Sequence, residues 1–326
     1  MNDTIWMWIG AFLLAGILTV LLEKKFIPFL MRIKMGQTIL EIGPRWHKSK
    51  EGTPTMGGIF FIAAIGISVL AFGLPLALKN GDGTIFKIFV MMLLFGAVGF
   101  IDDFVKFVKK RNKGLSAVQK MVFQFAIAAL FLISIRSRLT TVLSLPFTDF
   151  TLNLGIFYWV FAILLIVFVV NAVNLTDGID GLAGGITFVS FVFIGCVAWM
   201  LGKDDMGVLS ASVCGGMIGF LFYNYYPARI FMGDTGSLFL GGAVIGAAFW
   251  LNSPLIVCFF GLIFIWEAVS VMLQVFFFKT TGKRIFRMAP FHHHLEMCGW
   301  KETKIVAVFC LLTALFSVIA YFAFLI

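Results

Sequence analysis

The chain has 326 residues, of which 61% are hydrophobic and only 13% are charged, and its formal net charge is +9. Because soluble domains carry about a quarter charged residues, this composition excludes a soluble globular protein. The positions of the cations along the chain, and not their excess alone, indicate how the helices are oriented in the membrane.

Apolar segments long enough to cross a bilayer recur along the whole chain. We expect ten spans, at residues 5–22, 56–78, 85–101, 117–135, 155–173, 182–201, 207–223, 236–251, 254–278 and 304–326. The first lacks a signal-peptide cleavage pattern, so we interpret it as a retained helix. The alternating polarity of transmembrane strands is absent from the sequence. We therefore predict an all-α polytopic membrane protein with about ten transmembrane helices, in which residues 1–326 form a single transmembrane domain.

The positions of the cations predict the orientation of these helices. Twenty of the 25 Lys and Arg residues lie in or beside the loops that join an odd-numbered span to the next even-numbered span. The positive-inside rule places these loops in the cytoplasm and both termini on the extracytoplasmic side. A basic face of this kind also attracts anionic lipids, which is a sufficient role for most of its cations.

The first cytoplasmic loop ends with "RWHKSKEGTPTMGG", a basic segment punctuated by Gly and Pro that leads into the second span. Lys48 and Thr53 are candidates for phosphate contact, although an ordinary loop has the same composition.

Further along, "GFIDDFVK" places Asp102 and Asp103 at the cytoplasmic end of the third span. Acids at a helix C-terminus oppose the helix dipole, and adjacent residues point in different directions, so we expect two separate functional roles.

The fifth span ends in "NAVNLTDGID", where Asn174, Asp177 and Asp180 are spaced three apart. If this segment is helical, the three side chains share one face and can hold one ligand. The alternative is a flexible loop whose glycines allow close packing.

"FMGDTGS" precedes the eighth span, and Asp234 within it is the strongest candidate for a metal ligand. A helix start of this kind also binds phosphate, and Thr235 or Ser237 would alternatively serve as an ordinary N-cap.

In the ninth span Glu267 is either functional or paired inside the bundle, and Gln274 follows it on the same segment.

"MAPFHHHLE" in the last cytoplasmic loop carries His292, His293 and His294. Adjacent histidines without i+3 or i+4 spacing argue against a zinc site. Contact of one or two of them with a pyrophosphate or a sugar is the better interpretation.

All of these acidic motifs share the predicted cytoplasmic face. Converging aspartates repel one another unless a cation is bound, and Mg²⁺ is the divalent ion that best suits carboxylates and phosphates. Such a site suits phosphoryl transfer to a lipid. A membrane transporter is the competing class, but it would place its polar residues near the bilayer midplane, and here they lie at one interface.

Together, "IDDFVK", "NLTDGIDGL", "FMGDTGS" and "APFHHHLE" resemble the bacterial phospho-N-acetylmuramoyl-pentapeptide transferases, a family of the polyprenyl-phosphate N-acetylhexosamine-1-phosphate transferase superfamily. The resemblance extends over essentially the whole chain. The acidic motifs are common to the superfamily, whereas "PTMGG" and "HHHLE" favour this family over the related UDP-N-acetylhexosamine:polyprenyl-phosphate transferases.

The resemblance implies Mg²⁺-dependent transfer of phospho-MurNAc-pentapeptide from UDP-MurNAc-pentapeptide to undecaprenyl phosphate, which yields UMP and lipid I for peptidoglycan biosynthesis. It also implies a multi-pass protein of the bacterial inner membrane with its active site on the cytoplasmic face. A homodimer, a broken ninth helix beside a lipid groove, and binding of nucleoside inhibitors such as tunicamycin are further implications. We expect no nucleic-acid partner.

Carried over by motif, Asp102 would orient or deprotonate the lipid phosphate, Asp103 would support it, and Asp234 would ligate Mg²⁺ together with Asp177. His292 and His293 would lie near the diphosphate or the sugar and complete the catalytic set. The residues expected to bind substrate are Lys48, Thr53, Lys120, Asn174, Asp177, Asp180, Asn224, Phe231, Gly233, Gln274 and His294. Direct in-line attack by the lipid phosphate and a path through an aspartyl-phosphate both fit this set.

Overall fold

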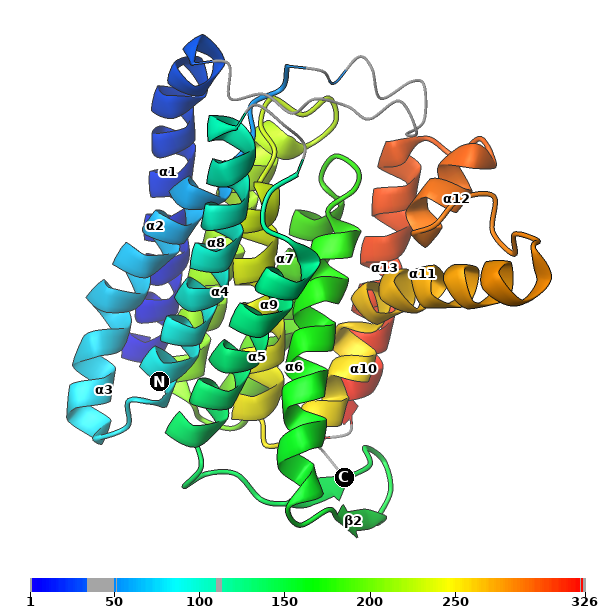
Figure 1. Ribbon diagram of the computed structural model, residues 1–326. Coiled ribbons are helices and arrows are strands. Elements are labelled where there is room, and N and C mark those ends of the chain that lie inside the picture. Colours follow the sequence, from blue (N-terminus) through cyan, green and yellow to red (C-terminus); the bar gives the residue numbers. More distant parts are fainter. Residues whose placement is uncertain (1, 34–49, 51, 110–112, 323, 325–326) are drawn as a thin grey trace.

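The computed structural model describes the whole chain except residues 1, 34–49, 51, 110–112, 323 and 325–326. Most of the long helices stand side by side in one bundle (Figure 1). Within the described chain, nine segments are long and apolar enough to cross a membrane: Thr4–Arg32, Gly58–Asn80, Thr84–Val108, Ala117–Ser134, Phe157–Thr176, Leu182–Met200, Asp204–Asn224, Leu262–Thr281 and Glu302–Phe322. The prediction of an all-α, multi-pass membrane protein is therefore confirmed.

The helices follow the predicted spans closely. The long ones are α1 (Asn2–Arg32), α4 (Thr84–Val108), α5 (Ala117–Ser134), α6 (Phe157–Thr176), α7 (Leu182–Met200), α8 (Asp204–Asn224), α9 (Gly233–Trp250), α11 (Leu262–Thr281) and α13 (Glu302–Phe322). The second span consists of α2 (Gly58–Ser68), a π-helical turn η2 (Val69–Gly73) and α3 (Leu74–Asn80). One apolar segment thus remains continuous through a local widening of the helix.

The eighth predicted span is α9, and it is not among the nine apolar segments. It begins with Asp234, Thr235 and Ser237 and contains five glycines, so it is less apolar than its neighbours. Almost all of its residues are buried, and it packs against α4 and α6. A Cβ atom on Gly241 would lie 2.7 Å from Cα of Val170, so the small residue permits close helix contact. Because protein surrounds this helix, its sequence does not have to be as apolar as that of a helix that faces lipid.

The ninth predicted span is divided in two. A short helical start, η3 (Pro254–Ile256) and α10 (Val257–Phe260), stops at Gly261, and α11 then continues in another direction. In Figure 1, α11 lies across the other helices and projects from the bundle, with the short α12 (Phe291–Met297) next to it. The structure thus contains the broken ninth helix that the family resemblance implied.

A small β-hairpin between α5 and α6 was not predicted. Strand β1 (Val142–Ser144) pairs antiparallel with β2 (Thr151–Asn153), with Leu143 opposite Leu152. Strands of three residues are far too short to cross a bilayer, and the hairpin lies at one end of the bundle (Figure 1).

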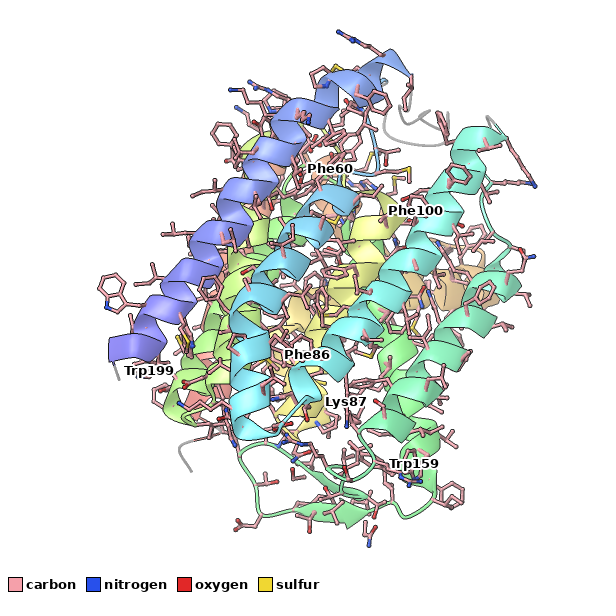
Figure 2. All side chains as sticks on the ribbon, turned by 90° about the vertical axis from the view of Figure 1, so that its left-hand side faces the viewer. Phe60, Phe86, Lys87, Phe100, Trp159 and Trp199 are labelled. Carbon is pink, nitrogen blue, oxygen red and sulfur yellow. The ribbon has the colours of Figure 1, made fainter. Side chains whose placement is uncertain are left out.

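Helix α1 begins and helix α13 ends toward the hairpin end of the bundle, whereas α4 ends and α9 begins at the opposite end (Figure 1). Figure 2 shows Trp159, Trp199 and Lys87 toward the hairpin end and Phe60 toward the other end. Tryptophan and lysine near the ends of spans are typical of a membrane–water interface. Which end faces the cytoplasm stays a prediction, but the acidic motifs lie at the end opposite to the start of α1 and the end of α13.

Candidate active site

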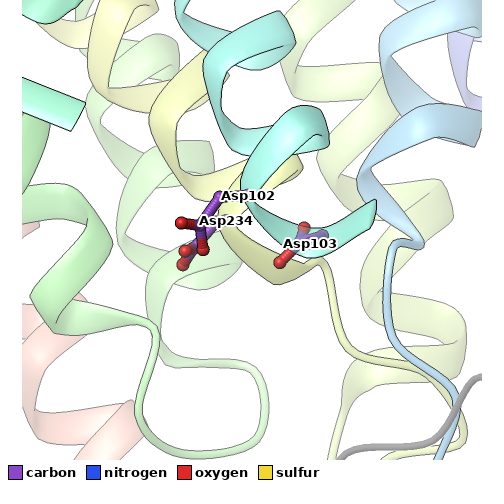
Figure 3. Close-up of side chains that lie close together, drawn as sticks. All are labelled: Asp102, Asp103 and Asp234. Atoms are coloured by element: carbon purple, nitrogen blue, oxygen red, sulfur yellow. The ribbon is translucent and has the colours of Figure 1, made fainter. Parts of the chain in front are cut away.

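The end of α4 and the start of α9 together form an aspartate cluster of Asp102, Asp103 and Asp234. Each residue offers a carboxylate oxygen, and these three atoms lie within 4.8 Å of one another. Figure 3 shows Asp102 beside Asp234, with Asp103 on the neighbouring side of α4. The two helices approach closely because Gly99 has no side chain: a Cβ atom there would lie 2.1 Å from the carbonyl oxygen of Asp234.

The two adjacent aspartates of α4 make different contacts, as their directions on a helix require. Oδ2 of Asp103 accepts hydrogen bonds from the backbone N–H of Thr235 at 2.9 Å and from its hydroxyl at 2.8 Å. Oδ1 of Asp102 accepts a hydrogen bond from the backbone N–H of Leu115 at 2.8 Å. Asp103 is thus bound to the first turn of α9, and Asp102 to the segment that precedes α5.

Two lysines neutralise part of the cluster. Nζ of Lys106 lies 2.6 Å from Asp102, 2.9 Å from Asp234 and 3.6 Å from Asp103. Nζ of Lys120 lies 2.7 Å from Asp234 and 3.7 Å from Asp102. When all three carboxylates are ionised, they face only two ammonium groups, and negative charge is left for a further cation. Lys120 was predicted from the family resemblance, whereas Lys106 was missed although it is one helical turn after Asp102.

Asn174 and Gly233 complete the surroundings of the cluster. Nδ2 of Asn174 donates to Oδ1 of Asp234 at 2.9 Å and to the hydroxyl of Ser237 at 2.7 Å. Gly233 has φ +70°, and a Cβ atom on it would lie 2.5 Å from Oδ2 of Asp103. Neither Thr235 nor Ser237 acts as an N-cap of its own helix, because the carboxylate of Asp103 from α4 takes that role.

The segment after α6 is a loop, so the helical alternative that the sequence allowed for it is wrong. The helix ends at Thr176, so Asn174, Asp177 and Asp180 do not share one helix face. The chain turns instead, and Gly181 has φ +79°, a conformation that favours glycine. Burial, followed by the nearby charges of Asp234, Asp103 and Asp180, raises the pKa of Asp177 to about 8. The negative charges of the cluster therefore act on Asp177, although Asp177 is not one of the three carboxylates that converge in the described chain.

Asp180 is buried in a network that joins three distant parts of the chain. Its carboxylate lies 2.7 Å from Nζ of Lys50 and accepts a hydrogen bond from the backbone N–H of Ala228 at 2.9 Å. Lys50 also lies 2.6 Å from Glu302 at the start of α13. Burial lowers the pKa of Lys50, but the hydrogen bonds to Asp180 and Glu302 outweigh this effect and raise it above its usual value. The network holds the loop after α6 against the segment before α2.

Two further predicted residues hold neighbouring loops together. Asn224 is buried, accepts a hydrogen bond from the backbone N–H of Gly181 at 3.0 Å and donates to the carbonyl of Ile230 at 2.8 Å. The backbone N–H of Phe231 donates to Pro54 at 2.8 Å, which brings half-buried Thr53 near the start of α9. Lys48 lies outside the described residues.

The three adjacent histidines of α12 have three different environments. His292 is fully buried against Glu267 of α11, with Nδ1 3.1 Å from Oε2. Nδ1 of His293 lies 2.6 Å from Oε2 of Glu296. Nδ1 of His294 accepts a hydrogen bond from the backbone N–H of Arg287 at 3.1 Å. Glu267 is thus paired inside the bundle, one of the two alternatives that its sequence position allowed.

Gln274 also contacts the loop that precedes α12, because its Oε1 accepts a hydrogen bond from the backbone N–H of Phe286 at 2.9 Å. His294 stacks on Phe291, with ring centroids 5.4 Å apart. The side chains of Gln274 and His294 therefore fix the segment between α11 and α12 by accepting hydrogen bonds from its backbone.

The donor set of the aspartate cluster fits a hard divalent cation. Carboxylate oxygens from two helices converge, an amide orients one of them, and two lysines leave the charge of the cluster incompletely neutralised. Such a centre can hold a metal ion beside phosphate oxygens, and the lysines add direct charge complementarity to phosphate.

Comparisons with known proteins agree with these observations. Residues 85–252 match the glycosyl transferase family 4 model, and residues 50–62 match signature 1 of the phospho-N-acetylmuramoyl-pentapeptide transferases. The chain is 42% identical to the phospho-N-acetylmuramoyl-pentapeptide-transferase of Halalkalibacterium halodurans over 311 residues, or 95% of each chain. It is 42% identical to the Listeria welshimeri protein of that name over 310 residues, or 94% of each chain. For the Geobacillus sp. protein the identity is 43% over 313 residues, or 96% of each chain.

Proposed function

The chain belongs to the phospho-N-acetylmuramoyl-pentapeptide-transferase family, and on that premise we propose that the aspartate cluster is its active centre. The reaction is the transfer of phospho-MurNAc-pentapeptide from UDP-MurNAc-pentapeptide to a polyprenyl phosphate, which yields lipid I and UMP for peptidoglycan biosynthesis. The observation that carries the assignment of the active centre is the meeting of three carboxylates at one end of a membrane bundle.

The metal of this centre is Mg²⁺, because its donors are carboxylate oxygens and its substrate is a diphosphate. Asp234 would hold the ion, with Asp177 as a second ligand. Asn174 fixes the orientation of the Asp234 carboxylate through its hydrogen bond to Oδ1. When bound, the ion would supply positive charge that offsets the charge of the diphosphate and of the leaving UMP.

The residues of α4 and α5 act on the lipid phosphate. Asp102 orients this phosphate or accepts its proton, while Asp103 keeps the start of α9 in place through Thr235. Lys106 and Lys120 contact phosphate oxygens in the substrate complex, because their ammonium groups already lie among the carboxylates. Attack by the lipid phosphate is direct and in line with the departing UMP.

The nucleotide sugar lies along the loops beside the cluster. Thr53, Phe231, Gly233, Asn224 and Asp180 border the uridine and its diphosphate, and Lys48 belongs to the same set. His292 and His293 approach the diphosphate or the sugar, and Gln274 and His294 border the same region through the chain between α11 and α12.

The protein resides in the bacterial inner membrane, with the aspartate cluster at the cytoplasmic face. Support comes from the concentration of Lys and Arg in the loops at that end and from the water-soluble nucleotide substrate. The acceptor is undecaprenyl phosphate, the active form is a homodimer, and nucleoside inhibitors such as tunicamycin bind at the nucleotide site. The whole chain acts as one transmembrane domain.

The test is release of UMP from UDP-MurNAc-pentapeptide, measured with and without undecaprenyl phosphate and Mg²⁺. We expect release only when the acceptor and the metal are both present. Release with UDP-N-acetylglucosamine as the better donor would instead identify a related transferase. Release with neither donor would contradict the enzyme assignment and favour a transporter. A phosphorylated protein trapped without acceptor would exclude the direct route.

A further inference from the structure

Glu267 and His292 form a pair that no solvent reaches. Both side chains have 0% exposure, although they come from different helices, α11 and α12. The backbone N–H of His292 donates to Oε1 of Glu267 at 3.1 Å, and Nδ1 of the ring lies 3.1 Å from Oε2. One histidine thus occupies both oxygens of a buried carboxylate, which would otherwise be costly inside the bundle.

The partner on Nδ1 decides where the ring proton sits. An ionised carboxylate only accepts hydrogen bonds, so the ring nitrogen that faces Glu267 carries the proton. Nε2 is then the nitrogen that is left as an acceptor.

Nε2 of His292 faces the loop after α6. It is buried and has no hydrogen-bond partner among the described residues. A Cβ atom on Gly178 would lie only 2.2 Å from it, so the ring nitrogen occupies the space that a side chain would need. Gly178 lies in the loop directly after α6, and Asn174 in the last turn of α6 donates a hydrogen bond to Asp234 of the aspartate cluster at 2.9 Å. The open nitrogen is therefore aimed at the edge of the candidate active centre.

We propose that Glu267 is a positioning residue, which keeps the proton of His292 on Nδ1 and so presents Nε2 as a hydrogen-bond acceptor at the Asp177–Gly178 turn. The ligand group that it takes is an O–H or N–H donor of the nucleotide sugar. This inference rests on the proposed function, because it assumes that the nucleotide sugar reaches that turn. Carboxylates that fix the tautomer of a functional histidine are a recurrent device in enzymes.

The test is nitrogen NMR on the full-length protein in lipid nanodiscs, labelled with ¹⁵N-histidine. The chain has only four histidines, and His292→Asn identifies the signals of His292 by their loss. We expect a protonated Nδ1 and a bare Nε2 at His292 in the wild-type protein. Addition of UDP-MurNAc-pentapeptide shifts the Nε2 signal. A protonated Nε2 and a bare Nδ1 in the wild type would overturn the proposal.

Glu267→Gln tests the carboxylate itself. The amide can donate as well as accept, so we expect Nδ1 of His292 to lose its fixed proton and kcat for UMP release to fall about 10- to 100-fold, with a smaller change in KM. Glu267→Asp keeps the acceptor-only chemistry and should restore the wild-type tautomer. Glu296→Gln is the matched control, because it changes the partner of His293 and should leave the signals of His292 unchanged.

The outcomes separate the two proposals. If the wild type releases UMP but Glu267→Gln keeps the wild-type tautomer and kcat, the positioning role is wrong and the proposed function stands. If the wild type releases no UMP, the proposed function fails, while the NMR result alone still decides the tautomer. If Glu267→Gln does not fold, the wild-type and Glu267→Asp spectra decide the assignment.

Discussion

Asp103 accepts two hydrogen bonds from Thr235, one from the backbone N–H at 2.9 Å and one from the hydroxyl at 2.8 Å. The carboxylate thus joins the C-terminal part of α4 to the first turn of α9. An acid near a helix C-terminus is unfavourable, but the same acid at the N-terminus of the neighbouring helix is favourable. The antiparallel arrangement of α4 and α9 therefore offsets the cost of placing Asp102 and Asp103 where they are.

Thr235→Val should remove the hydroxyl bond to Asp103 and keep the backbone bond. We expect the free energy of unfolding to fall by about 1 kcal/mol, the usual contribution of one such bond, and kcat to decrease. Thermal unfolding and UMP release measure the two effects. Thr313→Val is the control, since Thr313 is buried and its hydroxyl donates to the carbonyl of Phe309 in its own helix. Equal loss of kcat in both variants would argue against a special role for the Asp103–Thr235 contact.

Asp102→Asn should reduce turnover far more than nucleotide binding. The amide oxygen can still accept the hydrogen bond from Leu115, so the fold is kept, but the charge needed to orient or deprotonate the lipid phosphate is lost. Calorimetric binding of UDP-MurNAc-pentapeptide, compared with kcat, separates these effects. Equal losses in binding and turnover would show that Asp102 binds the nucleotide.

Lys106→Gln should make the cluster bind Mg²⁺ more tightly. The ammonium group now lies within 4 Å of all three carboxylates, and its removal leaves them less neutralised. We expect the Mg²⁺ concentration for half-maximal activity to fall several-fold, while kcat falls because a phosphate contact is lost. Lys109→Gln, a change at an exposed position one turn further along the chain, is the control. An unchanged or higher Mg²⁺ requirement in Lys106→Gln would be the opposite of this expectation.

Asp82→Asn should be nearly neutral, because Asp82 precedes α4 at the end of the bundle away from the cluster. Asp82 pairs with Arg138, and both side chains are partly exposed, so the pair contributes under about 1 kcal/mol. UMP release should match that of the wild type. Activity loss as large as that of Asp102→Asn would contradict the placement of the active centre.

The same pair predicts a pH dependence of stability. Burial raises the pKa of Asp82, but hydrogen bonds from Thr84 and the charge of Arg138 outweigh it, and the pKa is lowered overall. A lowered pKa stabilises the fold above the ordinary aspartate pKa of about 4, and this contribution disappears as the pH falls through the lowered value. The small stability difference between wild type and Asp82→Asn should therefore be present at neutral pH and vanish in acid.

Much of the site could be predicted because charge in a membrane chain is rare. Asp102, Asp103 and Asp234 lie at the ends of apolar segments, and counting the spans places them at one end of the bundle. The glycine-containing helix α9 was still recognisable as an apolar segment, although it is enclosed by protein.

The remaining features depend on contacts between distant residues. The sequence around Lys50 gives no sign that it meets Asp180 and Glu302, 130 and 252 residues further along. Lys106 looked like an ordinary interfacial cation, and only the approach of α9 brings it to Asp234. The change of direction at Gly261 and the short hairpin likewise arise from packing and local turns, which hydropathy does not encode.

The most direct test of the aspartate cluster is the binding of Mn²⁺, a spectroscopic substitute for Mg²⁺, followed by electron paramagnetic resonance on the full-length protein in nanodiscs. We expect one bound Mn²⁺ per chain in the wild type and in Asp82→Asn. Asp234→Asn should lose this bound ion together with UMP release, while remaining folded. Wild-type Mn²⁺ binding and metal-dependent turnover in Asp234→Asn would contradict the metal centre at the junction of α4 and α9.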